Sequence, residues 1–290
     1  MPYTEMFDAI AKKAEQNSAQ NEVDYIGEDG LLVCGYCHTA KQARIPRFVG
    51  SIDFGEEKVV SAMCKCEAEK WEEEKDKIRK VDLIRKLKIE VFPACKYNSN
   101  PENDMSKWTF ENDKGYQPEL IRKAINYVKD FENYKAIGKG MLLYGETGVG
   151  KSYAAACIAN ALVDKGISVI MTSFAFIASE LQGAQEKKSY YNRLNNCSLL
   201  ILDDLAAERD TEYMKEIVHT VIDNRLSTGL PMIITSNLTN EELRNPASMK
   251  DKRLFSRLSK ACHPVLVKGD DLRKRHMVES YAEMERLLNQ

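Results

Sequence analysis

Apolar and polar positions alternate in blocks along the C-terminal two thirds of the chain. The runs "MLLY", "SVIMT", "LLILD" and "MIITS" predict strands over 140–145, 167–173, 198–203 and 231–236. Each run is apolar at nearly every position, which is typical of parallel strands that helices cover on both faces. The pattern therefore predicts an α/β fold built from βαβ units.

The segments between these strands have helical periodicity. Helices are predicted over 118–136, 151–165 and 211–228, and a further helical stretch reaches about residue 194. Gly166 and Gly229 follow two of these segments, at the positions where helix C-caps are expected.

The N-terminal part has a different pattern. Residues 1–20 predict a short charged helix, and frequent glycines from residue 29 to about residue 66 indicate short strands joined by turns. Residues 67–90 contain neither Gly nor Pro and predict a charged helix. It carries apolar residues at every third position, namely Ile78, Val81, Ile84 and Leu87. Such a helix either links two domains or docks a partner protein, and the sequence leaves both interpretations open.

A segment rich in Pro, Asn, Asp and Gly, residues 93–116, is interpreted as a connector. The predicted organisation is thus an N-terminal domain over 1–90, a linker over 91–117 and an α/β domain over 118–290.

Composition narrows the classes of function. With 42 basic and 44 acidic residues the formal net charge is −2, which argues against coating nucleic acid through bulk charge but leaves local DNA contacts open. No apolar run is long enough to span a membrane, and the polar N-terminus does not resemble a secretory signal. We therefore expect a cytoplasmic protein without a membrane partner, whose 8 cysteines do not form structural disulfides.

The strongest chemical signal is the stretch "GETGVGKS" between a predicted strand and a predicted helix. It comprises Gly145, Glu146, Thr147, Gly148, Val149, Gly150, Lys151 and Ser152. Glycines at this spacing let backbone N–H groups cradle a polyphosphate, while the lysine reaches the β- and γ-phosphates and the serine hydroxyl ligates Mg²⁺.

Three further groups complete the candidate site. Asp203 and Asp204 end a buried strand, where one carboxylate can hold the Mg²⁺ shell and the other can orient an attacking water. Asn237 follows "IITS" at the same sheet edge and either positions water or simply forms a turn. Arg253, Arg257 and Arg273 are ordinary surface residues or, in an oligomeric ATPase, supply charge to a phosphate.

In this order, "GETGVGKS", "LLILDD", "IITSN", "RLFSRL" and "DLRKR" resemble the AAA+ ATPases of the bacterial helicase-loader family, the DnaC and DnaI type. The resemblance covers about residues 118–276. It implies a P-loop ATPase core with a parallel sheet flanked by helices, and it implies ATP as the nucleotide. It places Lys151 and Ser152 in Walker A, and Asp203 and Asp204 in Walker B. Asn237 becomes sensor 1, Arg257 the arginine finger and Arg273 sensor 2.

The resemblance has two further consequences. The second Walker B residue is usually Glu, so the shorter Asp204 leads us to expect slow hydrolysis. Thr211 and Tyr213 match the family segment that faces single-stranded DNA, where a tyrosine can stack on a base. A helix cap and a packing role explain the same two residues equally well. Lys187, Lys188, Tyr190, Tyr191 and Arg193 form a second, weaker basic and aromatic candidate.

Two close cysteine pairs, Cys34 with Cys37 and Cys64 with Cys66, predict a structural Zn²⁺ site. Such a site replaces the hydrophobic core that a short segment cannot build, and His38 is a possible substitute ligand. Helicase loaders of the DnaI type also carry a zinc-binding N-terminal domain that contacts the helicase. The other cysteines, Cys95, Cys157, Cys197 and Cys262, have no partners at ligand spacing and are interpreted as packed apolar residues.

The predicted function is that of an ATP-dependent DNA replication protein. It would load a hexameric helicase of the DnaB type onto single-stranded DNA and assemble with itself when ATP is bound. An IstB-type ATP-binding helper of DNA transposition is the alternative. A small-molecule P-loop kinase is a third hypothesis, against which the Walker B pair and Arg257 argue. A non-hydrolysing DNA adaptor is a fourth, which the Asp at position 204 leaves open.

Overall fold

The computed structural model describes residues 23–49, 52–53, 55–94, 104–183, 186–205, 211–246 and 248–289. The helix predicted over 1–20 and the packing predicted for Cys95 lie outside these ranges. The chain divides into two compact units, Met1–Val81 and Asp82–Gln290, which are described separately.

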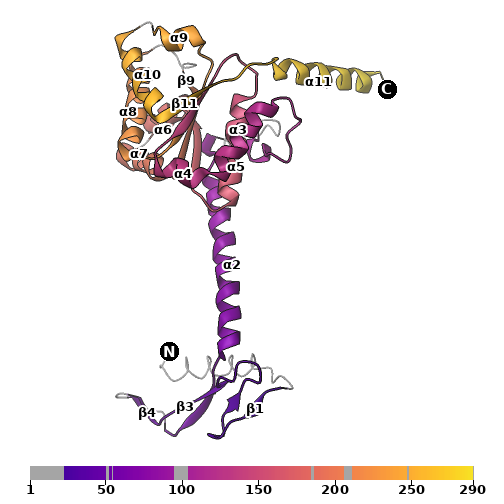
Figure 1. Cartoon of the computed structure of the whole chain (residues 1–290), viewed down its shortest axis with the longest axis vertical. Coiled ribbons are helices and arrows are strands. Elements are labelled where there is room, and N and C mark those ends of the chain that lie inside the picture. The colour runs from indigo at the N-terminus through magenta and orange to yellow at the C-terminus, as the bar shows by residue number, and fades with distance from the viewer. Residues whose placement is uncertain are drawn as a thin grey trace. The chain divides into compact units, whose positions relative to one another are not determined.

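The first unit consists of short antiparallel strand pairs, as the glycine pattern predicts (Figure 1). Strand β1 (Tyr25–Ile26) pairs with β2 (Leu32–Val33), β3 (Gln42–Ile45) with β6 (Lys58–Ser61), and β4 (Phe48–Val49) with β5 (Ile52–Asp53). In the described part of this unit the buried apolar residues are only Leu31, Leu32, Cys34 and Cys64. So small a core needs other interactions to hold the strands together.

One such interaction is a buried ion cluster around Lys41, which is 2% exposed. Its ammonium lies 2.9 Å from Oε1 of Glu67 and 2.9 Å from Oδ2 of Asp24. Hydrogen bonds to these two carboxylates raise the pKa of Lys41, so it stays charged inside the unit. Oδ1 of Asp24 also accepts a hydrogen bond from the backbone N–H of Gly35 at 3.2 Å. The cluster joins three chain segments that the short strands alone leave separate.

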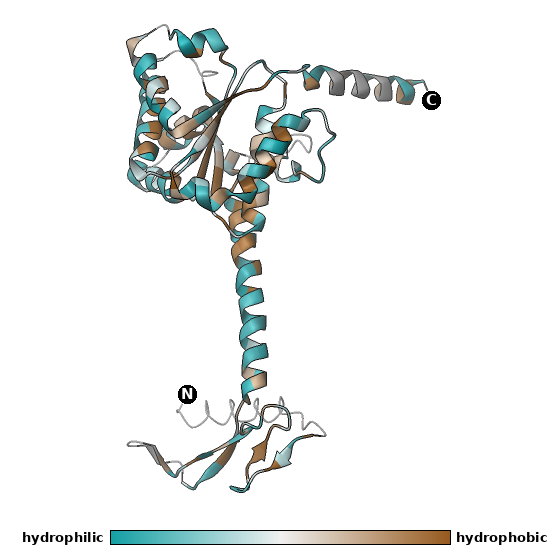
Figure 2. Cartoon of the chain, viewed as in Figure 1, coloured by the Kyte–Doolittle hydropathy of each residue, from teal (hydrophilic) through white to brown (hydrophobic). Residues whose placement is uncertain are grey.

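Helix α2 (Lys65–Glu90) begins in the first unit and ends in the second, so the charged helix predicted for residues 67–90 is confirmed. Its predicted apolar stripe is buried only at one end, because Ile78 and Val81 are 59% and 64% exposed whereas Leu87 is 9% exposed. Figure 2 shows the middle of this helix as mostly hydrophilic. The linking and docking interpretations of α2 both remain predictions.

The second unit contains a five-stranded parallel sheet with the strand order β11-β7-β10-β9-β8. The strands are β7 (Gly140–Tyr144), β8 (Val169–Ser173), β9 (Leu199–Leu205), β10 (Met232–Ser236) and β11 (Cys262–Leu266). The four predicted strands are thus confirmed within two residues at their ends, and the α/β fold with them.

Helices cover both faces of this sheet. The helices that follow α2 in the described ranges are α3 (Pro118–Lys129), α4 (Phe131–Ala136), α5 (Lys151–Asp164), α6 (Phe174–Gly183), α7 (Lys187–Asn196), α8 (Glu212–Thr228), α9 (Asn240–Arg244), α10 (Met249–Ala261) and α11 (Leu272–Leu288). Figure 1 shows α3 and α5 on one side of the sheet and α6, α8 and α10 on the other. The predicted helix over 118–136 is divided at Asp130, and the helical stretch ending near 194 is two helices. None of the helices in the described ranges is both long and apolar enough to cross a membrane.

The apolar strands are buried on both faces because alternate residues enter two different cores. Met141 and Leu143 of β7 join the core that includes α3 and α5, here called the first core. Leu142 and Tyr144 join the core that includes α6, α8 and α10, here called the second core. The strands accordingly appear as hydrophobic ribbons in Figure 2. Cys157, Cys197 and Cys262 are buried in these layers, which confirms their interpretation as packed apolar residues.

Part of the segment interpreted as a connector is packed on helix α5. The turn η3 (Met105–Lys107) begins this contact, and the side-chain amide of Asn160 donates to the carbonyl oxygens of Met105 and Trp108 at 2.8 and 2.9 Å. The hydroxyl of Tyr153 donates to the carbonyl of Thr109 at 3.0 Å. These hydrogen bonds hold residues 105–109 against α5, within the second unit.

A buried arginine that the sequence does not single out holds the second core together. Arg225 of α8 is 0% exposed, and its guanidinium donates to five backbone carbonyl oxygens. These acceptors are Leu194, Asn195, Cys197, Ser198 and Pro231, at 2.7 to 3.3 Å. The cation satisfies the carbonyls at the C-terminal end of α7 and joins them to the start of β10.

We expect Arg225→Met to lower the free energy of unfolding by about 3–5 kcal/mol, because it leaves several buried carbonyl groups without a donor. Urea unfolding measures this loss. Arg122→Met, which changes an exposed arginine of α3, is the matched control and should cost less than about 0.5 kcal/mol. Equal stability of the two variants would contradict this role of Arg225.

Candidate functional site

The candidate residues gather at one edge of the parallel sheet. The loop from Gly145 to Gly150 follows β7, the two aspartates end β9, and Asn237 follows β10, which lies between those strands. Arg273 stands in the first turn of α11, after β11 on the other side of β7. Because the carboxyl ends of parallel strands meet at the same edge, residues from distant parts of the sequence come together there.

The glycine-rich loop has the backbone that a phosphate cradle requires. Gly148 and Gly150 have φ angles of 81° and 92°, in the left-handed region that favours glycine. A Cβ at Gly148 would also lie 1.9 Å from Oδ1 of Asp271. Val149, 1% exposed, anchors the loop in the first core, and α5 begins directly after it. The N-terminal N–H groups of α5 therefore face the loop, which suits an anion.

The ammonium of Lys151 is held at the centre of the site. It donates to Oδ1 of Asn237 at 2.9 Å and to the carbonyl oxygens of Gly145 and Glu146 at 2.9 and 2.5 Å. Burial lowers the pKa of Lys151, while the charges of Asp204 and Asp203 oppose this effect. The sequence predicted Lys151 and Asn237 at the same edge of the sheet, and the two residues are in direct contact.

The carboxylate of Asp203 is joined to the loop by hydroxyl groups. Its Oδ1 accepts hydrogen bonds from Ser152 Oγ at 2.8 Å and from Thr235 Oγ1 at 2.5 Å. Burial raises the pKa of Asp203, and these two hydrogen bonds oppose the rise. A serine hydroxyl beside a carboxylate is the kind of oxygen set that Mg²⁺ prefers, so the residues fit a nucleotide-bound magnesium ion.

Asp204 differs from its neighbours in backbone conformation. Its φ is 59°, which is uncommon for a residue other than glycine but is more readily adopted by Asp and Asn. Its N–H donates to Oγ1 of Thr235 at 2.9 Å. The sequence predicted Asp204 at the site, yet its left-handed backbone and the role of Thr235 were not predicted. The available signal for Thr235 was a hydroxyl residue directly after the three apolar residues with which β10 begins.

The arginines occupy different positions. The backbone N–H of Leu272 donates to the carbonyl oxygen of Gly148 at 2.9 Å, so the adjacent Arg273 follows a residue that is bonded to the loop. Arg257 of α10 forms an ion pair with Asp223 of α8, and its side chain is 58% exposed. Within one chain it is therefore a surface residue, and its action on the nucleotide of a neighbouring subunit remains a prediction.

The candidate DNA contacts have structural roles of their own. Oγ1 of Thr211 caps α8 by accepting a hydrogen bond from the N–H of Met214 at 3.3 Å. Tyr213 is 40% exposed in the first turn of that helix. Tyr190 and Tyr191 pack against the second core, and burial raises the pKa of Tyr190 to about 12. The cap predicted for Thr211 is confirmed, and DNA contact stays a prediction.

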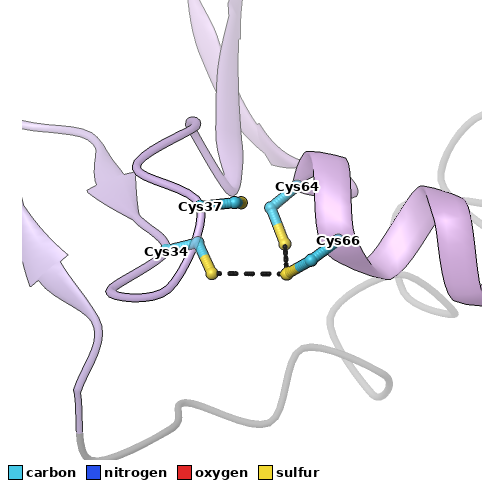
Figure 3. A group of neighbouring side chains, drawn as sticks. All are labelled: Cys34, Cys37, Cys64 and Cys66. Carbon is cyan, nitrogen blue, oxygen red and sulfur yellow. Dashed lines mark hydrogen bonds between the residues drawn. The ribbon is translucent and has the colours of Figure 1, made fainter.

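The four predicted cysteines of the first unit converge. Their Sγ atoms all lie within 4.8 Å of one another, with 3.7 Å between Cys34 and Cys66 and 3.2 Å between Cys64 and Cys66 (Figure 3). Four thiolates around tetrahedral Zn²⁺ stand about 3.8 Å apart, since each Zn–S bond is about 2.3 Å. His38 does not belong to this cluster, and its Nδ1 lies 3.2 Å from the hydroxyl of Tyr25.

Local structure prepares these thiols for a cation. Cys64 and Cys66 stand at the start of α2, whose N-terminal dipole favours a thiolate. Cys37 Sγ lies 3.0 Å from Oγ1 of Thr39, and this hydrogen bond lowers the pKa of Cys37 to about 5. Burial raises the pKa of Cys64, an effect that a bound divalent cation reverses. The donor set thus fits a closed structural zinc site.

Comparisons with known proteins agree with this geometry. A family model described as IstB-like ATP binding protein matches residues 80–280. The replicative helicase loader DnaI of Bacillus subtilis is 29% identical over 167 residues, which cover 53% of this chain and 53% of that protein. The replicative helicase loader DnaC of Escherichia coli is 26% identical over 196 residues, covering 65% of this chain and 78% of that protein.

Two other similarities complete the comparison. An ATP-binding protein in an insertion sequence of Mycobacterium tuberculosis is 29% identical over 143 residues, covering 48% of this chain and 57% of that protein. A crystal structure of DnaI has a TM-score of 0.49 and 24% identity, covering 63% of this chain and 95% of that one. The match thus spans about half the length of the Bacillus relative. With the family model matching well over half of its residues, the chain belongs to the family of IstB-like ATP-binding proteins.

Proposed function

We propose that this protein is a helicase loader that uses ATP to place a hexameric replicative helicase of the DnaB type onto single-stranded DNA. The observation that carries the proposal is the pairing of a switch-like nucleotide site with a separate cysteine module. The relatives named as replicative helicase loaders support it, although their identity to this chain is low.

The site suits a switch because its charges respond to the γ-phosphate. The ammonium of Lys151 donates a hydrogen bond to the side-chain amide of Asn237, directly after β10. A γ-phosphate that attracts this ammonium would break the hydrogen bond and free the amide. Ser152 and Asp203 would hold Mg²⁺, and the ion would balance the charge of the phosphates. Asp204 would orient the attacking water, and Arg273 would sense the nucleotide from α11. Hydrolysis is expected to be slow and to depend on DNA or on the partner.

In the proposed organisation residues 1–90 are the partner-binding module, 91–117 the linker and 118–290 the AAA+ ATPase domain. Zn²⁺ bound by Cys34, Cys37, Cys64 and Cys66 would stabilise the module, which has few buried apolar residues. Thr211 and Tyr213 are the proposed contacts to single-stranded DNA, in an assembly of several ATP-bound copies of the chain.

A helper of DNA transposition is the second candidate, favoured by the description of the family and by the relative from an insertion sequence. The cysteine module favours the loader, because a core that acts only on DNA and transposase does not need a separate metal-dependent domain.

The central test is the loading of a DnaB-type helicase onto circular single-stranded DNA by the full chain with ATP. Cys64→Ser should lose bound zinc and loading while keeping ATP binding, because the metal stabilises only the N-terminal module. His38→Asn is the matched control, since Asn tolerates the left-handed backbone at this position and His38 lies outside the cluster. Wild-type protein that contains no zinc, or that captures a transposase but no helicase, would reject the loader.

We expect Asp204→Asn to bind Mg²⁺ and ATP normally and to lose turnover by about 100-fold or more, because an amide cannot accept the proton of an attacking water. Asn also tolerates the left-handed backbone, so the geometry is kept. Lys151→Ala is the comparison variant and should lose nucleotide binding itself. Unchanged hydrolysis in Asp204→Asn would remove Asp204 from the mechanism.

For Arg257→Ala we expect near-normal ATP binding and turnover reduced by about 10³-fold, because an arginine finger acts on the nucleotide of the adjacent subunit. Mixing this variant with Lys151→Ala should restore activity at interfaces where an intact loop meets an intact arginine. If Arg257 only forms its surface ion pair with Asp223, the single variant will hydrolyse ATP normally and mixing will change nothing.

A further inference from the structure

The two aspartates of the site form a β-bulge in the sheet. Residues Leu200 to Leu202 of β9 pair with Met232 to Ile234 of β10, and the next pair is Leu205 with Ser236. Two residues of β9, Asp203 and Asp204, thus stand opposite the single residue Thr235. Bulges of this kind redirect side chains and are frequent beside active sites.

The bulge reverses the alternation of β9. Ile201 belongs to the first core and Leu202 to the second, so in a regular strand Leu205 would face the first core again. It lies in the second core instead. In a regular strand Asp204 would follow Leu202 toward the second core, away from Asp203. With the bulge, Asp203 accepts a hydrogen bond from Ser152, directly after the phosphate loop, at 2.8 Å, while the N–H of Asp204 donates to Thr235 at 2.9 Å.

Two buried hydroxyl groups of β10 hold this arrangement. The Thr235 hydroxyl, in a residue that is 0% exposed, accepts from the N–H of Asp204 at 2.9 Å and donates to Oδ1 of Asp203 at 2.5 Å. Oγ of Ser236 donates to the carbonyl oxygen of Leu205 at 2.8 Å, beyond the bulge. The Thr235 hydroxyl therefore joins the left-handed backbone of Asp204 to the carboxylate of Asp203.

We infer that Thr235 is a positioning residue which, by holding the Asp203–Asp204 bulge, directs both consecutive carboxylates to the nucleotide. The inference rests on the proposed ATP-dependent function. It also accounts for aspartate at position 204, because a left-handed backbone accepts Asp more readily than Glu.

The test compares three variants of the full chain. Thr235→Val removes the hydroxyl and keeps the shape, whereas Thr235→Ser keeps the hydroxyl. Thr172→Val is the matched control on the neighbouring strand β8, where Thr172 is 3% exposed and no hydrogen bond among the described residues joins its hydroxyl to either aspartate. The measurements are steady-state turnover with single-stranded DNA and helicase, and binding of a fluorescent ATP analogue at increasing Mg²⁺ concentration.

We expect Thr235→Val to lower kcat about 10-fold with KM nearly unchanged, and to raise the Mg²⁺ concentration for half-maximal binding by a similar factor, because a hydrogen bond to a charged group is lost. Thr235→Ser and Thr172→Val should match the wild type. If Thr235→Val does not fold, Thr235→Cys is used in its place. The same loss of kcat and the same rise in Mg²⁺ requirement are expected, since a thiol is a weak hydrogen-bond donor.

Wild-type kcat and Mg²⁺ requirement in the folded Thr235→Val or Thr235→Cys variant would overturn the inference. An equal loss in Thr172→Val, or no rescue by Thr235→Ser, would do the same, since either result indicates general packing. Wild-type protein without Mg²⁺-dependent nucleotide binding would instead reject the proposed function itself, a result that is distinguishable because it does not involve the variants.

Discussion

The buried carboxylate of Asp203 is the constraint on which the rest of the site depends. It is 9% exposed, and one of its oxygens accepts hydrogen bonds from both Ser152 and Thr235. An ionised group in such a place is costly unless its acceptors are satisfied. Both hydroxyl groups donate to this carboxylate. They thereby join β9 to Ser152, directly after the phosphate loop, and to Thr235 of β10.

That linkage explains why the strand order matters. Because β10 lies between β7 and β9, Asn237 at its end can contact Lys151 while Thr235 contacts both aspartates. Movement of Lys151 would therefore shift Asn237 at the end of β10, and movement of β10 would shift Asp204 through Thr235. In the proposed loader, this shared strand is the physical means by which the nucleotide state reaches the rest of the domain.

Different interactions stabilise the two units. The second buries its strands between two helical layers, and Arg225 satisfies buried carbonyl groups at the C-terminal end of α7. The first, with few buried apolar residues in its described part, relies on the Lys41 ion cluster and on four converging thiols. A metal bound by these thiols would therefore stabilise the first unit, since the candidate nucleotide site is built from residues of the second.

The α/β class, the strand positions, the phosphate loop and the cysteine pairs could all be predicted from the sequence, because they depend on local periodicity and on residues at fixed spacing. The placement of Asn237 at the same sheet edge as Lys151 followed from the rule that parallel strands end at one edge, and the hydrogen bond between the two is a finding of the structure. The contacts of Thr235 with the two aspartates and the burial of Arg225 at the C-terminal end of α7 are seen only in the folded structure. A bulge, a left-handed aspartate and a buried arginine arise from pairing between distant segments, and no local pattern of apolar and polar residues records which partners those segments will meet.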